Sequence, residues 1–225
     1  MKRKIITTED GSSTIHLEEW NEHYHSTHGA IQEANHVYIK TGLHYVQHTF
    51  NPAQIQLLEI GFGTGLNAFM TYLEAEKNNF NINYQGVEAY PVSPEEIAQL
   101  NYISALKAEH KATIFDKMHV CEWGKEMVLS ENFTLIKRQQ FFDQITDQKQ
   151  FNLIYFDAFG ARVQPELWTV AIFEKMYKAL QKNGVLVTYA AKGSVRRAMQ
   201  EVGFTVERLP GPPGKREMLR ATKNN

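Results

Sequence analysis

Apolar runs and helix-forming segments alternate along most of this sequence, and that alternation limits the fold more than any other feature. The strands that it predicts are 54–60, 81–90, 133–138, 151–156 and 184–190, and the helices that it predicts are 66–78, 94–106, 165–180 and 195–203. Strands that alternate with helices in this way predict a parallel sheet that is covered by helices on both faces.

The C-terminal segment departs from this alternation. Residues 204–211 and 216–222 lie on either side of a PGPPG turn and predict an antiparallel pair of strands after the last helix. Such a pair is unusual in a dehydrogenase-type sheet but suits the Rossmann-like fold of class I methyltransferases that use S-adenosyl-L-methionine (SAM). We therefore expect an α/β fold with a mostly parallel seven-stranded sheet, helices on both faces and an antiparallel C-terminal hairpin.

The N-terminal part predicts a different organisation. Residues 13–20 predict a short strand, and residues 30–48 predict a helix in which Gly42 is a break or a cap, whereas residues 107–132 carry no clear pattern. A chain of 225 residues with 43% hydrophobic residues can bury one sizeable core. We expect residues 1–225 to form a single SAM-dependent methyltransferase domain, with residues 1–50 as an N-terminal extension that closes over the active site.

Composition favours a soluble cytoplasmic protein. The single cysteine, Cys121, excludes an internal disulfide and fits a reducing compartment. The basic start MKRK is followed by no apolar stretch, so we expect no signal peptide, and no run has the roughly 18 apolar residues that a membrane span needs. The formal net charge of −1 does not indicate a nucleic-acid binder, but residues 188–225 contain eight basic and only three acidic residues.

The stretch LLEIGFGTGLNA, residues 57–68, joins a predicted strand to a predicted helix through a glycine-rich turn. Its G-x-G-x-G spacing differs from the G-x-G-x-x-G of dinucleotide folds, and an acidic residue, Glu59, precedes it. A carboxylate would repel a pyrophosphate but would attract a cationic ligand such as SAM. Glu88, at the end of the second strand, can accept hydrogen bonds from ribose hydroxyls. The alternatives are a turn without a ligand and a solvent-exposed Glu88.

Asp157 follows the apolar strand FNLIYF and precedes a turn. It lies beside the expected reversal of strand order, where sheets of this kind bind ligands. The sequence leaves four roles open for this carboxylate: a helix cap, a metal ligand, a cofactor contact and a proton acceptor. The full set of predicted cofactor-binding residues is Glu59, Gly61, Phe62, Gly63, Thr64, Gly65, Asn67, Glu88 and Asp157.

Five stretches together resemble the methyltransferase domain of MnmC-type tRNA (5-methylaminomethyl-2-thiouridine) methyltransferases, including its stand-alone form. They are YHSTHGAIQEANHVYIKTGL (24–43), LEIGFGTGLNA (58–68), YFDAFGARVQPELW (155–168), AAKGSVRRAMQEVGF (190–204) and PGPPGKREML (210–219). The glycine loop is common to SAM enzymes, whereas the stretches around Asp157 and Lys215 are more specific. The resemblance implies transfer of a methyl group from SAM to the aminomethyl group of the modified wobble uridine, 5-aminomethyl-2-thiouridine, in tRNA.

Two features limit what the resemblance implies. The long form of the family first removes a carboxymethyl group with a flavin-dependent domain, and this sequence contains no such domain, so we expect no flavin and only the methylation step. Many relatives place an acidic residue near the adenine after the third strand. The sequence here is KRQQFF, so Gln139 or Gln140 is expected to take that place.

The expected reaction requires a neutral amine, because an ammonium has no lone pair to attack the methyl group. Asp157 is therefore predicted as the catalytic residue, which either accepts the amine proton or orients the amine. Tyr24 and His25 are expected in a loop that closes over the cofactor, with plain packing as the alternative. His23, His25 and His28 lack the helical spacing of a metal site, and we expect no metal.

The remaining predictions concern the RNA. A base splayed from the anticodon loop is expected to stack on Phe159 or Tyr24, whereas Trp168 is more consistent with the core. The predicted substrate-binding residues are Tyr24, His25, Phe159, Lys192, Arg196, Arg197, Lys215 and Arg216, of which the basic ones would contact tRNA phosphates. The sequence leaves the oligomeric state open. It also leaves open methylation of another amine and a non-catalytic SAM-binding protein, while the glycine spacing disfavours a nicotinamide dehydrogenase.

Overall fold

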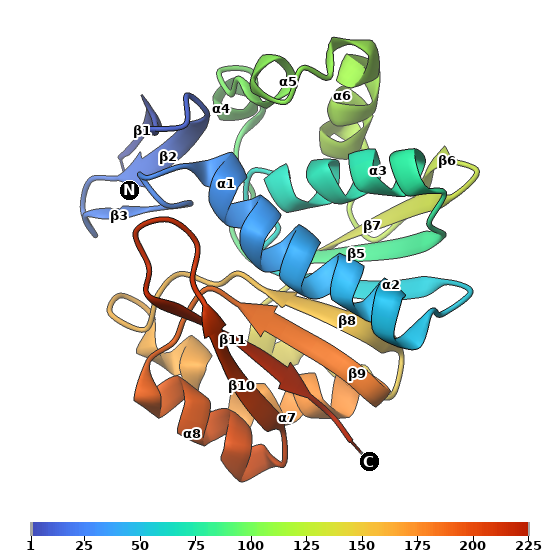
Figure 1. Ribbon diagram of the computed structural model, residues 1–225. Coiled ribbons are helices and arrows are strands. Elements are labelled where there is room, and N and C mark those ends of the chain that lie inside the picture. The colour runs from blue at the N-terminus through green and yellow to red at the C-terminus, as the bar shows by residue number, and fades with distance from the viewer. Residues whose placement is uncertain (1, 225) are drawn as a thin grey trace.

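The computed structural model describes residues 2–224, and its centre is an eight-stranded sheet with the strand order β10-β11-β9-β8-β4-β5-β7-β6 (Figure 1). Five strands are parallel to one another: β4 (Ile55–Ile60), β5 (Ile82–Glu88), β7 (Phe133–Gln139), β8 (Phe151–Phe156) and β9 (Leu180–Thr188). The C-terminal hairpin consists of β10 (Thr205–Pro210) and β11 (Glu217–Thr222), and β11 pairs antiparallel with β9. The predicted class of fold and the antiparallel hairpin are confirmed.

The predicted number of strands, seven, is wrong. The additional strand is β6 (Glu126–Ser130), which pairs antiparallel with β7 at the edge of the sheet. It lies in the stretch 107–132, where the sequence carries no clear pattern, because an edge strand has one partner and only Leu129 on it is fully buried. The same stretch also contains a 3₁₀ turn, η2 (Glu109–Lys111), and the helix α6 (Ala112–Val120).

Helices cover both faces of the sheet, and each face has its own hydrophobic core. The N-terminal helical segment and α3 (Leu66–Asn78) lie on one face (Figure 1). On the other face, α7 (Val170–Ala179) and α8 (Gly193–Val202) pack against each other and against the C-terminal part of the sheet. Continuously apolar strands such as β8, which is buried along most of its length, follow from this double coverage.

The N-terminal helix is one continuous helical segment that crosses the sheet, made of α1 (Ala30–Ala34), the π-helical η1 (Asn35–His44) and α2 (Tyr45–Phe50). Gly42 neither breaks nor caps it, contrary to the sequence-based expectation. A Cβ atom at Gly42 would lie 2.9 Å from Val187 Cγ2 and 3.2 Å from Tyr155 Cε1. Gly42 therefore lets the helix pack directly against β8 and β9.

Two predicted helices are shorter than expected. The segment 94–106 forms two short helices, α4 (Pro94–Ile97) and α5 (Tyr102–Ala105), and the segment 165–180 begins with a 3₁₀ turn, η4 (Pro165–Trp168), before α7. A capping box starts α4, in which Ser93 and Glu96 exchange hydrogen bonds. Another 3₁₀ turn, η3 (Phe142–Gln144), follows β7.

The first residues form a separate three-stranded sheet of β1 (Arg3–Thr7), β2 (Ser13–Leu17) and β3 (Glu22–His23), in that order. The predicted strand 13–20 thus ends at Leu17, and the turn that follows contains Trp20. This sheet is fastened to the α4–α5 region, since Ser13 N and Oγ donate to Asn101 Oδ1 at 2.8 and 2.9 Å. Arg3 also forms an ion pair with Glu96, at 2.9 Å.

The order of the strands determines where a ligand can bind. The chain passes from β4 through α3 to β5 on one side, and later returns as β8 on the other side of β4, so strand order reverses between β4 and β8. Ile60 pairs with Phe156 at the carboxyl ends of these strands, and the glycine loop and Asp157 follow directly. None of the helices between residues 2 and 224 has the length and hydropathy of a membrane span.

Candidate active site

The glycine loop passes very close to the backbone that follows β8. Gly61 has a φ of +89°, and a Cβ atom on it would lie 2.5 Å from the carbonyl oxygen of Asp157. Gly63 has a φ of +50°, and a Cβ atom there would lie 3.2 Å from the ring of Tyr24. Glycine at these positions avoids both the steric conflict and the left-handed strain that a side chain would bring.

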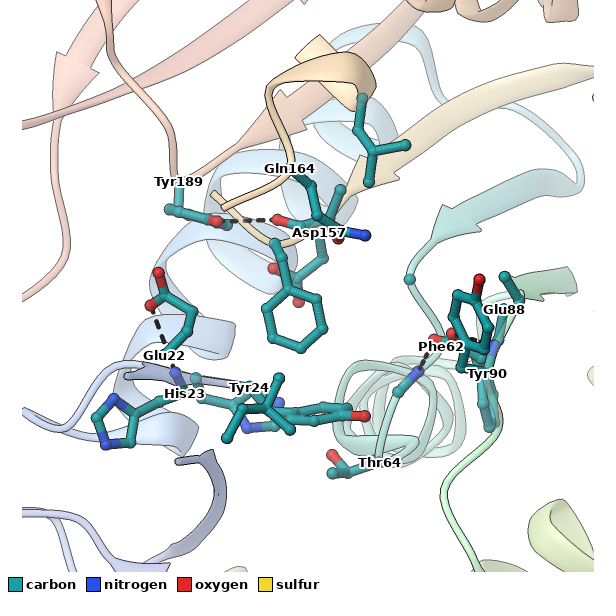
Figure 2. Close-up of a pocket in the computed structure, with 18 of the residues that line it drawn as sticks. Glu22, His23, Tyr24, Phe62, Thr64, Glu88, Tyr90, Asp157, Gln164 and Tyr189 are labelled. Carbon is teal, nitrogen blue, oxygen red and sulfur yellow. Dashed lines mark hydrogen bonds between the residues drawn. The ribbon is translucent and has the colours of Figure 1, made fainter. Parts of the chain in front are cut away.

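Glu88 lies at the end of β5, directly across from the glycine loop. Its carboxylate accepts hydrogen bonds from the backbone N–H of Gly63 at 3.1 Å and from that of Tyr90 at 2.9 Å. Figure 2 shows Glu88 and Tyr90 on one side of the pocket, Glu22 and His23 on the opposite side, and Tyr24 and Asp157 between them. The loop and the acidic strand end therefore form one side of a common pocket.

This pocket is a cavity of about 880 Å³ at the carboxyl ends of the central strands. It brings together eleven of the residues predicted from the sequence: Tyr24, His25, Gly61, Phe62, Gly63, Thr64, Asn67, Glu88, Asp157, Phe159 and Lys215. Six other predicted residues do not line it: Glu59, Gly65, Lys192, Arg196, Arg197 and Arg216. Gly65 lies behind the loop, against the ring of His119, and Glu59 is fully buried beneath it.

One amide connects the two carboxyl groups below the cavity. Asn67 Nδ2 donates to Glu59 Oε1 at 2.9 Å and to Asp157 Oδ2 at 2.8 Å. Burial raises the pKa of Glu59 well above its usual range, while the hydrogen bond from Asn67 opposes the rise. Glu59 therefore orients Asn67 from behind, rather than facing a ligand as the sequence suggested.

Of the two carboxyl groups that Asn67 connects, that of Asp157 is the one that lines the cavity. Burial raises its pKa to about 7, and the carboxylate of Glu33 acts in the same direction, while the Tyr38 hydroxyl, the Asn67 amide and the Lys215 ammonium oppose the rise. A carboxyl group with this pKa is both partly ionised and appreciably basic at neutral pH. Such a strongly shifted group in a cleft is typical of functional sites.

Lys215 lies inside the cavity wall and not on an outer surface. Its ammonium forms an ion pair with Glu33 and lies 3.9 Å from the centroid of the Tyr189 ring. The Tyr189 hydroxyl in turn donates to the carbonyl of Ala158 at 2.8 Å. Lys215 thus joins the turn of the C-terminal hairpin to the N-terminal helix, next to the loop that carries Asp157.

Tyr24 and His25 reach the site from the end of β3. The Tyr24 ring packs edge-on against Phe159, with 5.0 Å between ring centroids. The Nδ1 atom of His25 lies 3.2 Å from the Thr14 hydroxyl, and burial lowers the pKa of this histidine to about 4, so it is neutral. A neutral His25 adds no positive charge beside Asp157.

Trp168 belongs to the core, in agreement with the sequence-based interpretation. It is 5% exposed, and its indole N–H donates to the carbonyl of Phe159 at 2.7 Å. Gln139 and Gln140, expected near the adenine, do not line the cavity, whereas Phe141, Phe142 and Asp143 do. The acidic residue after the third parallel strand is therefore present in this chain, four residues beyond Gln139.

Several lining residues escaped the sequence-based analysis, among them Arg3, Trp20, Glu33, Tyr90, Asp143 and Tyr189. Glu33 occupies a helix position that resembles any solvated face, and Tyr189 continues an apolar strand, so neither pattern distinguishes them. Within the described part of the chain, no group of three or more His, Cys, Asp or Glu side chains is arranged to hold a metal ion.

The cavity fits SAM in its charge and in its free hydrogen-bonding groups. Glu88 and Asp157 offer carboxylates to hydroxyl and ammonium groups, and the glycine loop leaves room for a ligand beside its backbone. Asn67 is 3% exposed, lines the cavity, and its Oδ1 atom has no hydrogen-bond partner in residues 2–224. A buried acceptor of this kind indicates a ligand that brings a donor.

Comparison with known proteins supports this assignment. Residues 127–224 match a family described as S-adenosyl-L-methionine-dependent methyltransferase. The structure of MNMC2 from Aquifex aeolicus superposes with a TM-score of 0.74 at 22% identity, over 98% of this chain and 70% of that one. Spermidine synthase from Thermotoga maritima has the same fold at a TM-score of 0.55, with 14% identity, over 99% of this chain and 68% of that one. Together these matches show the fold of the class I SAM-dependent methyltransferases.

The sequence is also similar to proteins of one particular name. The protein from Leptospira borgpetersenii is 27% identical over 90% of this chain, and that from Cupriavidus necator is 29% identical over 88%. Both are named tRNA 5-methylaminomethyl-2-thiouridine biosynthesis bifunctional protein MnmC. The chain is homologous to these MnmC proteins, which confirms the resemblance predicted from its motifs. It spans about a third of their length, 32% and 31% respectively.

Proposed function

We propose that this protein transfers the methyl group of SAM to the aminomethyl nitrogen of a modified wobble uridine, 5-aminomethyl-2-thiouridine, in tRNA. The observation that carries the proposal is the position of Asp157, which lines the same cavity as the glycine loop and has a pKa raised to about 7. The names of the relatives supply the tRNA and the modified base, and the carboxylate supplies the chemistry that an amine acceptor needs.

SAM, when bound, supplies an electrophilic methyl group on a positively charged sulfur. Glu88 would accept hydrogen bonds from the ribose hydroxyls, and the glycine loop with Thr64 and Asn67 would lie along the rest of the cofactor. These residues give the ligand a fixed position, and a fixed position relative to the acceptor is itself a large part of catalysis.

Asp157 acts on the acceptor amine. An aminomethyl group is largely protonated at neutral pH, so the site must favour its neutral form or remove its proton. A carboxylate with a pKa of about 7 is a much stronger base than an ordinary aspartate, whose pKa is about 3.8. While it is ionised, Asp157 would orient the ammonium form of the acceptor and stabilise its positive charge. It would then accept the amine proton, which frees the nitrogen lone pair to attack the methyl carbon as the bond from that carbon to sulfur breaks.

The N-terminal segment completes the site. Residues 1–50 act as an extension of a single domain, 1–225, and cover the cavity with Tyr24 and His25. The basic residues at the start of α8 and in the C-terminal turn contact tRNA phosphates: Lys192, Arg196, Arg197 and Arg216. Lys215 pairs with Glu33 in the cavity wall, so we assign it to the part of the cavity that would hold the target base and not to a phosphate contact. A tRNA substrate is consistent with a cytoplasmic protein.

Mass spectrometry of tRNA nucleosides tests the proposal directly. The protein is incubated with SAM and with tRNA that carries the 5-aminomethyl-2-thiouridine base, and the nucleosides are analysed after digestion. We expect the modified nucleoside to gain the mass of one methyl substitution, and the Asp157→Ala variant to bind SAM without producing it. Binding of SAM by the wild-type protein without any methylated nucleoside would refute the function while leaving the cofactor assignment intact.

A further inference from the structure

The loop that follows Asp157 is held rigidly to the sheet. Asp157 N donates to the carbonyl of Ile60 at 2.9 Å, and the Tyr189 hydroxyl donates to the carbonyl of Ala158 at 2.8 Å. The indole N–H of Trp168 donates to the next carbonyl, that of Phe159, at 2.7 Å. The backbone of three consecutive residues, 157–159, is thus hydrogen-bonded to three separate parts of the chain, which fix the position of this loop.

Arg162, farther along this loop, fastens the N-terminal sheet to it. Its Nη2 atom donates to the carbonyls of Trp20 and Asn21 at 3.1 and 2.9 Å and to the carboxylate of Glu22 at 2.9 Å. The first two acceptors belong to the turn between β2 and β3, where Asn21 has a left-handed φ of 44°, and Glu22 is the first residue of β3. One guanidinium therefore determines where this turn, and Trp20 on it, lies relative to the loop of Asp157.

Three aromatic rings meet where the N-terminal sheet contacts the loop after Asp157: those of Trp20, Tyr24 and Phe159. The centroids of Trp20 and Phe159 are 5.9 Å apart and those of Tyr24 and Phe159 are 5.0 Å apart, with interplanar angles of 84° and 85°. All three side chains are half-buried and line the cavity that contains Asp157. Rings in edge contact with one another keep part of their π-faces available to a planar ligand.

We propose that Trp20 binds the substrate by stacking on the target base, and that Arg162 is a positioning residue that holds Trp20 in place for this contact. The inference rests on the proposed function, since it requires a base splayed out of the anticodon loop. Extruded bases in RNA are held mainly by stacking on aromatic side chains. Indole offers the largest π-face of the three rings, and Trp20 lies on the turn between β2 and β3 that lines the cavity.

Substitution of Trp20 tests the stacking contact. We expect Trp20→Ala to raise the KM for tRNA by about 30-fold, which is the middle of the range for loss of one base–aromatic stack, and Trp20→Phe to keep most of the affinity. The kcat and the affinity for SAM, measured by calorimetry, should remain those of the wild type. Phe50→Ala is the matched control, because Phe50 is an exposed aromatic residue at the end of α2, outside the cavity lining.

Substitution of Arg162 tests the positioning role. Arg162→Ala should raise the KM for tRNA and leave kcat unchanged, Arg162→Lys should restore part of the affinity, and the double variant with Trp20→Ala should bind hardly more weakly than Trp20→Ala alone. An unchanged KM for tRNA in Trp20→Ala overturns the inference and leaves the proposed function standing. Parallel loss of SAM affinity also overturns it, because Trp20 would then be structural. A wild-type protein that methylates no tRNA overturns both.

Discussion

Replacing Asp157 with asparagine should make the protein more stable and abolish the proposed methyl transfer. The carboxyl group has a pKa of about 7 in the folded protein, against 3.8 for the ordinary side chain. A difference of about three pKa units corresponds to about 4 kcal/mol of unfavourable free energy for burying the ionised form, at about 1.4 kcal/mol per unit. Asparagine keeps the shape and can still accept the hydrogen bond from Asn67 Nδ2.

The raised pKa of Asp157 also determines how the stability of the wild-type protein changes with pH. A folded-state pKa above the unfolded value means that the folded protein binds the proton more tightly, so stability falls as pH rises from about 4 to about 7 and stays low above that. Wild type and Asp157→Asn should therefore have similar stability near pH 4. At pH 8 the variant should be more stable by up to about 4 kcal/mol, which is on the order of 10 °C in Tm for a chain of this size.

Thermal and urea unfolding across pH 4–9 measure this difference. Glu33, Lys215, Tyr38 and Asn67 surround the carboxyl group, so the measured midpoint of the pH dependence reports their combined effect. A variant that is less stable than wild type at pH 8, or a difference that does not change with pH, would show that Asp157 is not a destabilised buried carboxylate. Asp157 would then also lack the raised basicity that the proposed proton transfer requires.

The other predictions concern residues around Asp157 and the proposed contact with tRNA. Asn67→Ala should cost about 1–3 kcal/mol of unfolding free energy, because two buried carboxyl oxygens lose their donor, and calorimetry should show weaker SAM binding. Gly61→Ala should destabilise the fold by about 1–3 kcal/mol, owing to its positive φ and the close approach to the Asp157 carbonyl; a mutant as stable as wild type in urea would contradict this. Arg196→Ala combined with Arg197→Ala should reduce the salt slope of tRNA binding by about one for each phosphate that the protein no longer neutralises, and an unchanged slope in filter binding would place the RNA elsewhere.

The sequence predicted that the glycine loop and Asp157 lie together at one edge of the sheet, because the order of the strands determines this. The glycine loop and Asp157 are almost a hundred residues apart, yet each follows a parallel strand, and adjacent parallel strands end at the same edge. The close approach of Gly61 to the Asp157 backbone follows from that arrangement. The position of a motif at the end of a strand is thus sufficient to bring it to the site.

Residues whose position depends on long-range packing could not be found in this way. Lys215 belongs to a basic segment, and its sequence neighbours suggest a phosphate contact, but Glu33 draws it into the cavity wall from a helix far away in the chain. Trp20 lies in a turn with no apolar periodicity, and Arg162, far away in the sequence, helps to hold this turn beside Phe159. Neither contact can be read from a local sequence pattern, because each joins two residues that are far apart in the sequence and meet only in the folded protein.

The amide of Asn67 holds the Asp157 carboxyl group in position without placing a positive charge beside it. A lysine or arginine there would also bridge Glu59 and Asp157, but its positive charge would lower the pKa of Asp157 and make it a weaker base. The Asn67 amide donates two N–H groups without a formal charge, and Glu33 offsets the positive charge of Lys215 nearby. The carboxylate is therefore held in position by neutral or compensated groups. Its burial raises its pKa and lowers the stability of the fold at the same time, and in the proposed reaction the raised pKa would make Asp157 basic enough to take a proton from an amine.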